Sequence, residues 1–496
     1  MSRTHAEWQQ LAATLGIEGR LFIDGEYAHA HDSRTFNCIN PATGDKLAEV
    51  AWSAAADVDA AVAAARRAFE SGVWSGLPPL KRGKILKRFA ALIRQHRDEL
   101  ALLETLDMGK PIGDSTTVDV PGAAYCVEWF AEAIDKVGGE VAPVDPKLVG
   151  LVTREPVGVV AAVVPWNFPI LMASWKFGPA LAAGNAVIVK PSEKSPLTAI
   201  RLAGLAKQAG IPDGIFQVLP GGGDVGKLLA LHMGVDCIAF TGSTAVGKLI
   251  AGYAAQSNLK RVWLELGGKS PNIILEDCPD LARAARTAAG AIYYNMGEMC
   301  TAGSRVLVQR SIKERFLEEF RKAAQRYYPA DPLDPAAGMG AIVDQIQFDK
   351  VLSYIDQGRG EGATLICGGQ ATQVESKGYF IEPTAFDCPH PDLTICREEI
   401  FGPVLSVITF DSIDEAVRIA NDTEYGLAAA VWTANVSTAH QVSRRLRAGT
   451  VWVNCYDEGG DMNLPFGGFK QSGNGRDKSL HALEKYTELK STLIKL

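Results

Sequence analysis

The stretch VGVVAAVVPW, residues 157–166, is an almost unbroken apolar run that ends in proline and tryptophan. Four similar runs follow, each ending in glycine, proline or a small polar residue: AVIVKPS at 186–192, IFQVLPG at 215–221, CIAFTGS at 237–243 and RVWLELGG at 261–268. Stretches with helical periodicity separate them, at 170–182, 195–210, 224–232 and 243–256. Continuous apolar strands joined by helical crossovers predict a parallel sheet covered on both faces, an α/β architecture typical of nucleotide-binding proteins. Ligands of such sheets gather at the carboxyl ends of the strands, so the pattern predicts a pocket there but not yet a reaction.

The regions on either side of these strands have patterns of their own. Upstream, residues 55–72 and 80–110 carry apolar residues at helical spacing, and residues 138–158 alternate between prolines as a protruding two-stranded segment would. After Ser270 a second alternating unit follows, with strands predicted at 272–277, 304–311, 403–410 and 450–456 and helices at 281–294 and 312–327. The tail, 480–496, begins helical and ends as a strand that could pair with a neighbouring edge or a partner chain.

Length, charge and cysteine usage exclude several classes of function. A chain of 496 residues is too long for one compact core, so two or three domains are expected. Its 50 basic and 57 acidic residues give a net charge of −7, which recommends neither nucleic acid nor a membrane as a partner. The amino-terminal residues lack a secretory signal pattern, and no apolar window approaches the length of a bilayer span. The nine cysteines are scattered without CxxC or Cys/His clustering, so we expect no disulfide framework, no metal site and a reducing compartment, the cytoplasm.

Two glycine-containing turns are candidates for phosphate binding. GGGDVG, residues 221–226, fits the GxGxxG pattern with Gly223 in the middle and could contact a cofactor. It follows the third strand rather than the first, so a plain strand-to-helix turn is the other interpretation. In FTGSTAVGK, residues 240–248, Gly242 ends a strand and Ser243 opens a helix, whose first N–H groups suit a pyrophosphate. An ordinary N-cap is the alternative for Ser243.

KPSE, residues 190–193, closes the second strand with a lysine and an acid. Lys190 and Glu193 could hold the hydroxyls of an adenosine ribose. The charge of Glu193 would repel a 2′-phosphate, which favours NAD over NADP without excluding NADP. An exposed turn is the alternative for this segment.

Three further side chains are candidates for catalysis. Asn167 in PWNFP could donate to an oxyanion or simply form a turn, and Glu265 ends an apolar strand, where burial would raise its pKa and suit a general base. Cys300, in NMGEMCTAGSR, is one of nine thiols, and an ordinary buried thiol is the commoner role. Together these groups could oxidise an aldehyde. A thiolate would add to the carbonyl, hydrogen-bond donors would hold the oxyanion, a cofactor would accept the hydride, and a base would activate water.

With these residues in place, the chain resembles the NAD(P)-dependent aldehyde dehydrogenase superfamily over essentially its whole length. The segments that carry the resemblance, in the family's order, are PWNFP, KPSEKSPLTA, FTGSTAVG, LELGGKSPNII, GEMCTAGSR, EEIFGPV and PFGGFKQSG. The resemblance implies that Cys300 is the nucleophile, that its N–H and Asn167 form the oxyanion hole, and that Glu265 is the base for thioester hydrolysis.

The resemblance also implies a cofactor site and a fold. The cofactor contacts expected in this way are Trp166, Lys190, Glu193, Gly242, Ser243, Leu266, Glu399 and Phe401. The fold expected is α/β, with a Rossmann-like cofactor domain, a catalytic α/β domain and a β-arm for oligomerisation. We expect residues 1–136 and 157–268 in the cofactor domain, 269–470 in the catalytic domain, and 137–156 with 471–496 in the arm of a homodimer or homotetramer.

The resemblance implies that the substrate is an aldehyde. For the part of the substrate away from the aldehyde group, its far end, the sequence offers only a resemblance to one branch of the family and the charge of one loop. The ending from residue 466 resembles the branch that acts on ω-amino or guanidino aldehydes, such as γ-glutamyl-γ-aminobutyraldehyde and 4-guanidinobutyraldehyde. The acidic loop YDEGGDMN, residues 456–463, could attract such a cation through Asp457, with Glu128 as a further candidate, although a solvated acidic loop is the alternative. The remaining residues expected in the substrate pocket are Phe168, Trp175, Met299, Thr301 and Phe466.

Other functions remain open at this point. A broad-specificity or betaine-type aldehyde dehydrogenase keeps the chemistry and changes the substrate. Acyl transfer to coenzyme A is disfavoured by Glu265, since acylating relatives usually lack a base there. A non-catalytic scaffold is the remote alternative, which the three catalytic candidates disfavour.

Overall fold

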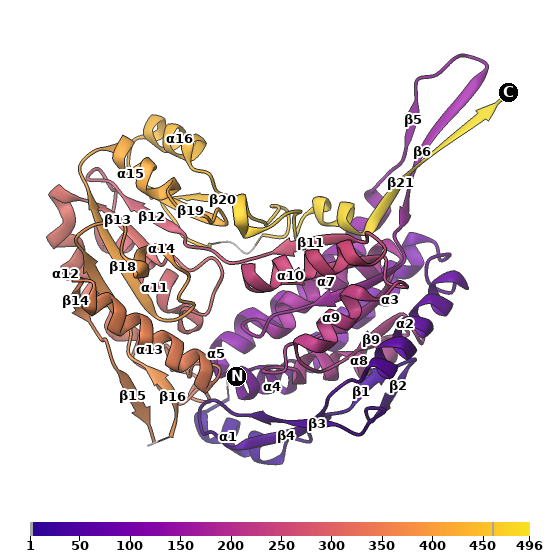
Figure 1. Cartoon of the computed structure of the whole chain (residues 1–496), viewed down its shortest axis with the longest axis horizontal. Helices are drawn as coiled ribbons and strands as arrows, with labels where there is room; N and C mark the ends of the chain where they lie inside the picture. The colour runs from indigo at the N-terminus through magenta and orange to yellow at the C-terminus, as the bar shows by residue number, and fades with distance from the viewer. Residues whose placement is uncertain (1–2, 376, 459–460) are drawn as a thin grey trace.

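The computed structural model describes residues 3–375, 377–458 and 461–496, which are organised around two seven-stranded sheets (Figure 1). The first sheet has the order β11 (Arg261–Glu265), β10 (Cys237–Thr241), β7 (Val159–Val163), β8 (Ala186–Lys190), β9 (Phe216–Val218), β1 (Leu21–Ile23) and β2 (Glu26–Ala28). The strands β11, β10, β7, β8 and β9 are parallel, and β1 joins β9 in the antiparallel sense. These five parallel strands are the five apolar runs, as the sequence predicted.

The composition of these strands follows from their position in the sheet. Every residue of β7, β8 and β10 is buried, because helices cover the sheet and leave no face for solvent. The helices of this lobe are α2 (Ala55–Glu70), α3 (Pro79–Gln95), α4 (Arg97–Met108), α6 (Val120–Ala133), α7 (Pro169–Ala183), α8 (Leu197–Ala209), α9 (Gly223–Leu231) and α10 (Thr244–Gln256). One continuous hydrophobic core joins them to the sheet.

The helical stretch expected at 80–110 is two helices rather than one. The chain leaves helical geometry at His96, whose φ and ψ are −95° and 23°. The His96 ring contacts the carboxylate of Glu99 at 2.7 Å, and the carboxylate of Glu99 also pairs with Arg201 on α8. The side-chain contacts of His96 and Glu99 therefore stabilise a break where the periodicity predicted a continuous helix.

The second sheet lies in the other lobe. Its order is β14 (Thr364–Cys367), β17 (Thr384–Cys388), β18 (Val404–Phe410), β13 (Arg305–Gln309), β12 (Pro271–Ile274), β19 (Ala428–Trp432) and β20 (Thr450–Val453), all parallel except the edge strand β14. The helices of this lobe are α11 (Leu281–Tyr293), α12 (Lys313–Ala324), α13 (Gln345–Gly360), α14 (Thr394–Arg397), α15 (Ile413–Asn421) and α16 (Val436–Arg445). A second large core fills it. The short helix α1 (His5–Thr14) and two hairpins, β3 (Thr35–Ile39) with β4 (Lys46–Ala51) and β15 (Ala371–Val374) with β16 (Lys377–Ile381), complete the chain outside the arm.

A three-stranded arm projects away from both lobes (Figure 1). It consists of β5 (Glu140–Ala142), β6 (Leu148–Pro156) and the carboxyl-terminal strand β21 (Thr487–Lys495), which pairs antiparallel with β6 along its whole length. The expectation that 471–496 belongs to the arm is wrong for its first half. Residues 471–486 pack instead against the first sheet, where the Leu266 N–H donates to the carbonyl of Ser472 at 3.0 Å and Asp477 is buried.

In the described part of the chain, no helix combines the length and the apolar character that crossing a membrane would require.

Candidate active site

The crevice between the carboxyl ends of β7 and β10 forms the centre of the site. From β7 the chain moves to β8 on one side, while β10 lies on the other, so the strand order reverses here. Such reversal points are where open α/β sheets bind ligands. Turns after β7, β10 and β11 join the second lobe around a cavity of about 160 Å³, lined by Pro165, Trp166, Asn167, Met172, Thr241, Gly242, Ser243, Glu265, Leu266, Gly267, Cys300, Gln347, Lys350, Glu399 and Phe401. Thus the fold brings the proposed thiol, amide and carboxylate to a single cavity.

The loop that carries Cys300 is shaped by its own backbone and by Gly268. After α11, Asn295 and Met296 take positive φ values of 50° and 56°, which ends the helix and turns the chain toward the cavity. The Asn295 amide then donates to the carbonyl of Asn167 at 3.1 Å. Gly268 passes so close that a Cβ there would lie 2.4 Å from the carbonyl oxygen of Cys300. The LELGG turn therefore fixes the Cys300 loop by a contact that only glycine allows.

Cys300 differs from most of the other thiols in accessibility. Five of the nine cysteines are fully buried, whereas Cys300 keeps partial exposure toward the cavity. The cavity is narrow, so burial still dominates and raises the pKa of the Cys300 thiol, followed by the charges of Glu265 and Glu399. The thiol is thus protonated at rest, and its activation requires a proton acceptor.

Asn167 is held with its amide beside the Cys300 loop. Its side chain is buried and donates one N–H to the carbonyl of Glu298 at 2.8 Å. The amide carries a second N–H. An amide anchored in this way is preorganised to donate to an oxyanion that forms at Cys300.

Glu265 ends β11 and is 4% exposed. Its Oε1 has no hydrogen-bond partner among the described residues. Burial, with the charge of Asp477 as the next cause, raises the pKa of Glu265 to about 8, against the opposing charges of Lys176 and Lys485. The carboxyl is consequently protonated in most molecules at pH 7 and becomes a base as the pH rises through about 8.

A buried charge cluster behind Glu265 escaped the sequence reasoning. Asp477 pairs with Lys176 on α7 and with Lys485, and all three are at most 3% exposed. Burial would raise the pKa of Asp477, but the two ammonium groups outweigh it and lower that pKa. The signal in the sequence was a lone lysine in the apolar helix stretch ILMASWKFGPALA. Its partner lies 301 residues away, so the pattern alone could not reveal the pairing.

The cleft continues past Ser243 as a wider, more polar hollow of about 530 Å³ between α10, α13 and α14. Ser243 caps α10 by accepting from the N–H of Val246 at 3.3 Å, so the open helix terminus faces this hollow with its partial positive charge. Lys190 and Glu193 form an ion pair at 3.5 Å after β8, the strand next to β7, but they do not line the enclosed cavity. Anion-binding groups along an extended cleft fit a dinucleotide.

The far end of the cavity holds a partly buried carboxylate on the second lobe, that of Glu399. Glu399 accepts from the N–H of Gly268 at 2.9 Å, and burial raises its pKa while Lys350 and Lys269 oppose the shift. The rings of Phe401 and Trp166 meet edge to face, 5.2 Å apart. Gln347, which the sequence did not predict as a site residue, donates to the carbonyl of Phe401 at 2.6 Å and holds the chain at Phe401 in place.

Gly223 has a different position from the other predicted cofactor residues. It is the first residue of α9 and lines neither hollow of the cleft. The neighbouring Gly222 packs against Trp52, whose ring lies 2.8 Å from where its Cβ would be. The structure therefore favours the strand-to-helix turn over a cofactor contact at GGGDVG.

The residues expected in the substrate pocket gather along α7 and the Cys300 loop. Phe168 stacks on Tyr294 with ring centroids 6.3 Å apart, and Trp175 meets Phe466 edge to face at 5.2 Å. Met299 and Thr301 are buried on either side of Cys300. Trp175 is one helical turn beyond Met172, which lines the cavity, so the two side chains share a face of α7.

The two predicted acidic contacts have different surroundings. Asp457 is solvent-exposed, yet the surrounding protein raises its pKa, and its charge acts on the Cys300 thiol. Glu128 pairs with Arg94 between α3 and α6 and does not line the cavity, so its contact with substrate stays a prediction. Residues 459–460 of the acidic loop lie outside the described residues.

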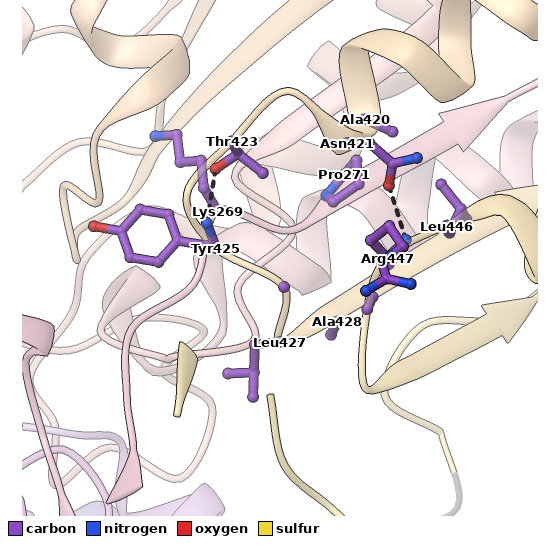
Figure 2. A pocket seen from close by; sticks show the side chains of 13 residues that line it. Lys269, Pro271, Ala420, Asn421, Thr423, Tyr425, Leu427, Ala428, Leu446 and Arg447 are labelled. Atoms are coloured by element: carbon purple, nitrogen blue, oxygen red, sulfur yellow. Dashed lines mark hydrogen bonds between the residues drawn. The ribbon is translucent and has the colours of Figure 1, made fainter. Parts of the chain in front are cut away.

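A separate hollow near Lys269 is too small to compete with this site (Figure 2). It encloses about 10 Å³, room for one water at most. Figure 2 shows Asn421 bonded to the backbone of Arg447 and Thr423 to the backbone of Tyr425, contacts that brace its wall. Burial lowers the pKa of Lys269 to about 8, and its ammonium has no partner among the described residues.

Comparison with known proteins decides which chemistry this geometry belongs to. The model of the aldehyde dehydrogenase family matches residues 27–492. This chain belongs to the aldehyde dehydrogenase family. It is 54% identical to the NADP/NAD-dependent aldehyde dehydrogenase PuuC of Escherichia coli (strain K12) over 492 residues, covering 99% of this chain and 98% of that protein.

Solved structures of aldehyde dehydrogenases have the same fold. The γ-glutamyl-γ-aminobutyraldehyde dehydrogenase of Burkholderia cenocepacia J2315 is 74% identical, with a TM-score of 0.98 and full coverage of both chains. An indole-3-acetaldehyde dehydrogenase in complex with NAD⁺ is 61% identical, with a TM-score of 0.99 and full coverage of both chains. The predictions of the family and of an α/β aldehyde dehydrogenase fold are confirmed.

Proposed function

We propose that this aldehyde dehydrogenase oxidises an aldehyde with a nitrogen-bearing far end to the carboxylate, with NAD as the hydride acceptor and Cys300 as the nucleophile. The observation that carries the proposal is the meeting of Cys300, Asn167 and Glu265 in one cavity at the reversal point of the first sheet.

The reaction divides between the three side chains. With Glu265 ionised, the sulfur of Cys300 bonds to the carbonyl carbon while the thiol proton passes to Glu265. The resulting oxyanion receives hydrogen bonds from the backbone N–H of Cys300 and the second N–H of Asn167. NAD, when bound, supplies the acceptor for the hydride that leaves this carbon, which turns the adduct into a thioester.

Hydrolysis then uses Glu265 a second time. After losing its proton to solvent, the carboxylate takes a proton from a water molecule, whose oxygen attacks the thioester carbon. The C–S bond breaks, the acid leaves, and the sulfur of Cys300 is reprotonated. Transfer of the acyl group to coenzyme A is the competing outcome, and a buried base beside the nucleophile favours water. Adding coenzyme A and finding a thioester product would contradict hydrolysis.

The residues of the cleft suit NAD more than NADP. We assign Lys190 and Glu193 to the adenosine ribose, Ser243 to the pyrophosphate, and Glu399 with Phe401 to the nicotinamide end. Glu193 is half-exposed beside the buried Lys190, so its carboxylate is free to accept from ribose hydroxyls and to repel a 2′-phosphate. The relative named PuuC is called NADP/NAD-dependent, so NADP is a weaker alternative here.

The nitrogen-bearing substrate rests on the names of relatives and on charge. Two relatives are named for aminoaldehydes, the γ-glutamyl-γ-aminobutyraldehyde dehydrogenase and an aminoacetaldehyde dehydrogenase of Pseudomonas aeruginosa. Asp457 adds a carboxylate near the nucleophile. A broad or betaine-type specificity is the alternative. An Asp457→Ala variant that left the ratio of kcat/KM between 4-guanidinobutyraldehyde and propanal unchanged would contradict a role for this charge.

Two variants test the chemistry directly. Cys300→Ala is expected to form no NADH, measured at 340 nm. Glu265→Gln is still expected to release about one NADH per site in a first burst, which is slower than in the wild type because the thiol lacks its proton acceptor. Later turnover should be slow, because hydrolysis lacks its base. A full steady-state rate in Glu265→Gln would remove Glu265 from the hydrolytic step.

We further propose that the lobe built on the first sheet, residues 1–136 with 157–268, binds the cofactor, and that residues 269–470 supply the nucleophile. The arm would join the subunits of a homodimer or homotetramer. We place the protein in the cytoplasm. Exposed apolar side chains on the arm support the assembly: Val141, Leu489, Leu493, Ile494 and Leu496. Nine free thiols support a reducing compartment. Light scattering on a chain truncated before Thr487 tests the arm, and an unchanged mass would contradict it.

A further inference from the structure

Lys478 holds its ammonium group over the aromatic pair that lies along α7 from the nucleophile. Its Nζ is 5.3 Å from the ring centroid of Trp175 and 6.0 Å from that of Phe466. Burial lowers the pKa of Lys478, while the charges of Asp457 and Asp461 raise it. The catalytic chemistry described above gives this cation no part.

The backbone is strained to present Lys478 in this way. Lys478 and Ser479 have consecutive positive φ values of 60° and 49°, a left-handed conformation that side chains other than glycine rarely take. Neighbouring bonds enforce it: Asp477 and Phe466 exchange backbone hydrogen bonds of 2.7 and 2.8 Å, and the N–H of Ser479 donates to the carbonyl of Met462 at 2.7 Å. Such over-determined strain is characteristic of functional sites.

The position of Lys478 ties it to the substrate path. Trp175 follows Met172 of the cavity wall by one helical turn, and the charge of Asp457 acts on both Lys478 and the Cys300 thiol. The preceding residue, Asp477, raises the pKa of Glu265. Lys478 thus lies beside aromatic rings that continue the α7 face of the cavity wall, among charges that also act on the Cys300 thiol.

The positive charge of Lys478 and the negative charges of Asp457 and Asp461 together select the chemical group at the far end of the substrate. A substrate that ends in a lone ammonium or guanidinium would be attracted by Asp457 and Asp461 but repelled by Lys478. A far end that carries an ammonium and a carboxylate on one carbon satisfies both, with the carboxylate on Lys478 and the ammonium toward the aspartates. The methylene chain between this end and the aldehyde would lie along Trp175 and Phe466.

We propose that Lys478 forms a carboxylate-binding subsite, and that the preferred substrate is an aldehyde whose far end is an α-amino acid group, as in γ-glutamyl-γ-aminobutyraldehyde. This rests on the proposed function and narrows it from nitrogen-bearing aldehydes in general to zwitterionic ones. Lys478 binds substrate and takes no part in bond making.

The test compares three aldehydes on the wild type and two variants. The aldehydes are γ-glutamyl-γ-aminobutyraldehyde, its glutaryl analogue, which keeps the carboxylate and lacks the ammonium, and hexanal, which lacks both. Lys478→Met removes the charge and keeps the length, and Lys478→Arg restores the charge. Thermal unfolding of each variant shows whether the chain remains intact.

The expected result is a split between KM and kcat. Lys478→Met raises KM about 10-fold to 100-fold for both carboxylate-bearing aldehydes, the loss of one charge-assisted hydrogen bond, with kcat unchanged and hexanal unaffected. Lys478→Arg recovers most of the affinity. Equal changes for all three aldehydes would overturn the subsite and leave Lys478 as a structural cation over Trp175. A wild type that prefers hexanal to the γ-glutamyl aldehyde would overturn it too, whereas no NADH with any of the three aldehydes would refute the proposed function itself.

Discussion

Asp477 lies between the ammonium groups of Lys176 and Lys485, and replacing it with asparagine changes both stability and the base. The carboxylate is 1% exposed and balances two cations that are also buried. Asp477→Asn keeps the volume but leaves both ammonium groups without a counter-ion. Breaking a buried ion pair by removing one partner costs about 3–5 kcal/mol, so we expect a loss of that order in the free energy of unfolding.

The same substitution shifts the pH at which Glu265 ionises. Asp477 raises the pKa of Glu265 and the two lysines lower it, so removing the aspartate charge leaves the lysines to favour the carboxylate. The wild-type rate of thioester hydrolysis should rise as the pH climbs through about 8, the pKa of Glu265. In Asp477→Asn we expect this rise of the rate with pH, the alkaline limb of the profile, at a pH about one unit or more lower. One pH unit corresponds to about 1.4 kcal/mol of altered charge interaction.

The assay is the steady-state rate from pH 6 to 10, with denaturant unfolding followed in parallel. Lys176→Met is the variant of opposite sign, because it removes a cation and should move the limb to higher pH. Lys490→Ala is the matched control for stability, since its pair with Glu155 at 2.9 Å is exposed and its loss should cost at most about 0.5 kcal/mol. A limb that stays near pH 8 in Asp477→Asn, or moves the same way in both charge variants, would refute the reasoning.

Three further predictions concern the cavity. Asn167→Ala should lower kcat about 100-fold to 1,000-fold with little change in KM, as the loss of one oxyanion donor does, and an unchanged kcat would exclude Asn167 from that role. Gly268→Ala should abolish NADH formation, because the new Cβ would lie 2.4 Å from the carbonyl oxygen of Cys300, whereas Gly252→Ala, with open space at its Cβ, should keep full activity. Glu193→Ser should raise kcat/KM with NADP relative to NAD, since the charge that repels a 2′-phosphate is gone, and a constant ratio would contradict the assignment.

The sequence predicted the parts of the fold that depend on local pattern. The five apolar runs from residue 157 onward became parallel strands because full burial demands uninterrupted apolar residues. Ser243 opens its helix as expected and also forms the N-cap that the sequence offered as the alternative, since capping depends only on nearby residues. The amino-terminal strands β1 and β2 went unpredicted, because they are short, three residues each, and join the sheet through a partner far along the chain.

What failed or stayed a prediction depended on contacts between distant segments. The carboxyl-terminal stretch was assigned to the arm as a whole, yet Gly473 packs so tightly on β11 that a Cβ would lie 2.1 Å from the carbonyl oxygen of Leu264. Glu128 has the right charge for a cationic substrate but is paired with Arg94, and its contact with substrate stays a prediction. Charge and composition cannot distinguish these positions, because pairing and burial are properties of the folded chain.

The sequence by itself predicted the family and the five parallel strands of the first sheet, and it singled out Cys300 as the proposed nucleophile, because motif spacing and hydrophobic period are written along the chain. Only the tertiary structure decided the state of the groups around Cys300. The raised pKa of Glu265 follows from its burial and from the charge of Asp477. Asp477 lies 212 residues after Glu265 in the sequence. The cation of Lys478 lies over Trp175, a residue far away in the sequence, and three backbone hydrogen bonds to Phe466 and Met462 hold the chain at residues 477–479. Electric fields and strain depend on distance in space, and distance in space is set only when the chain has folded.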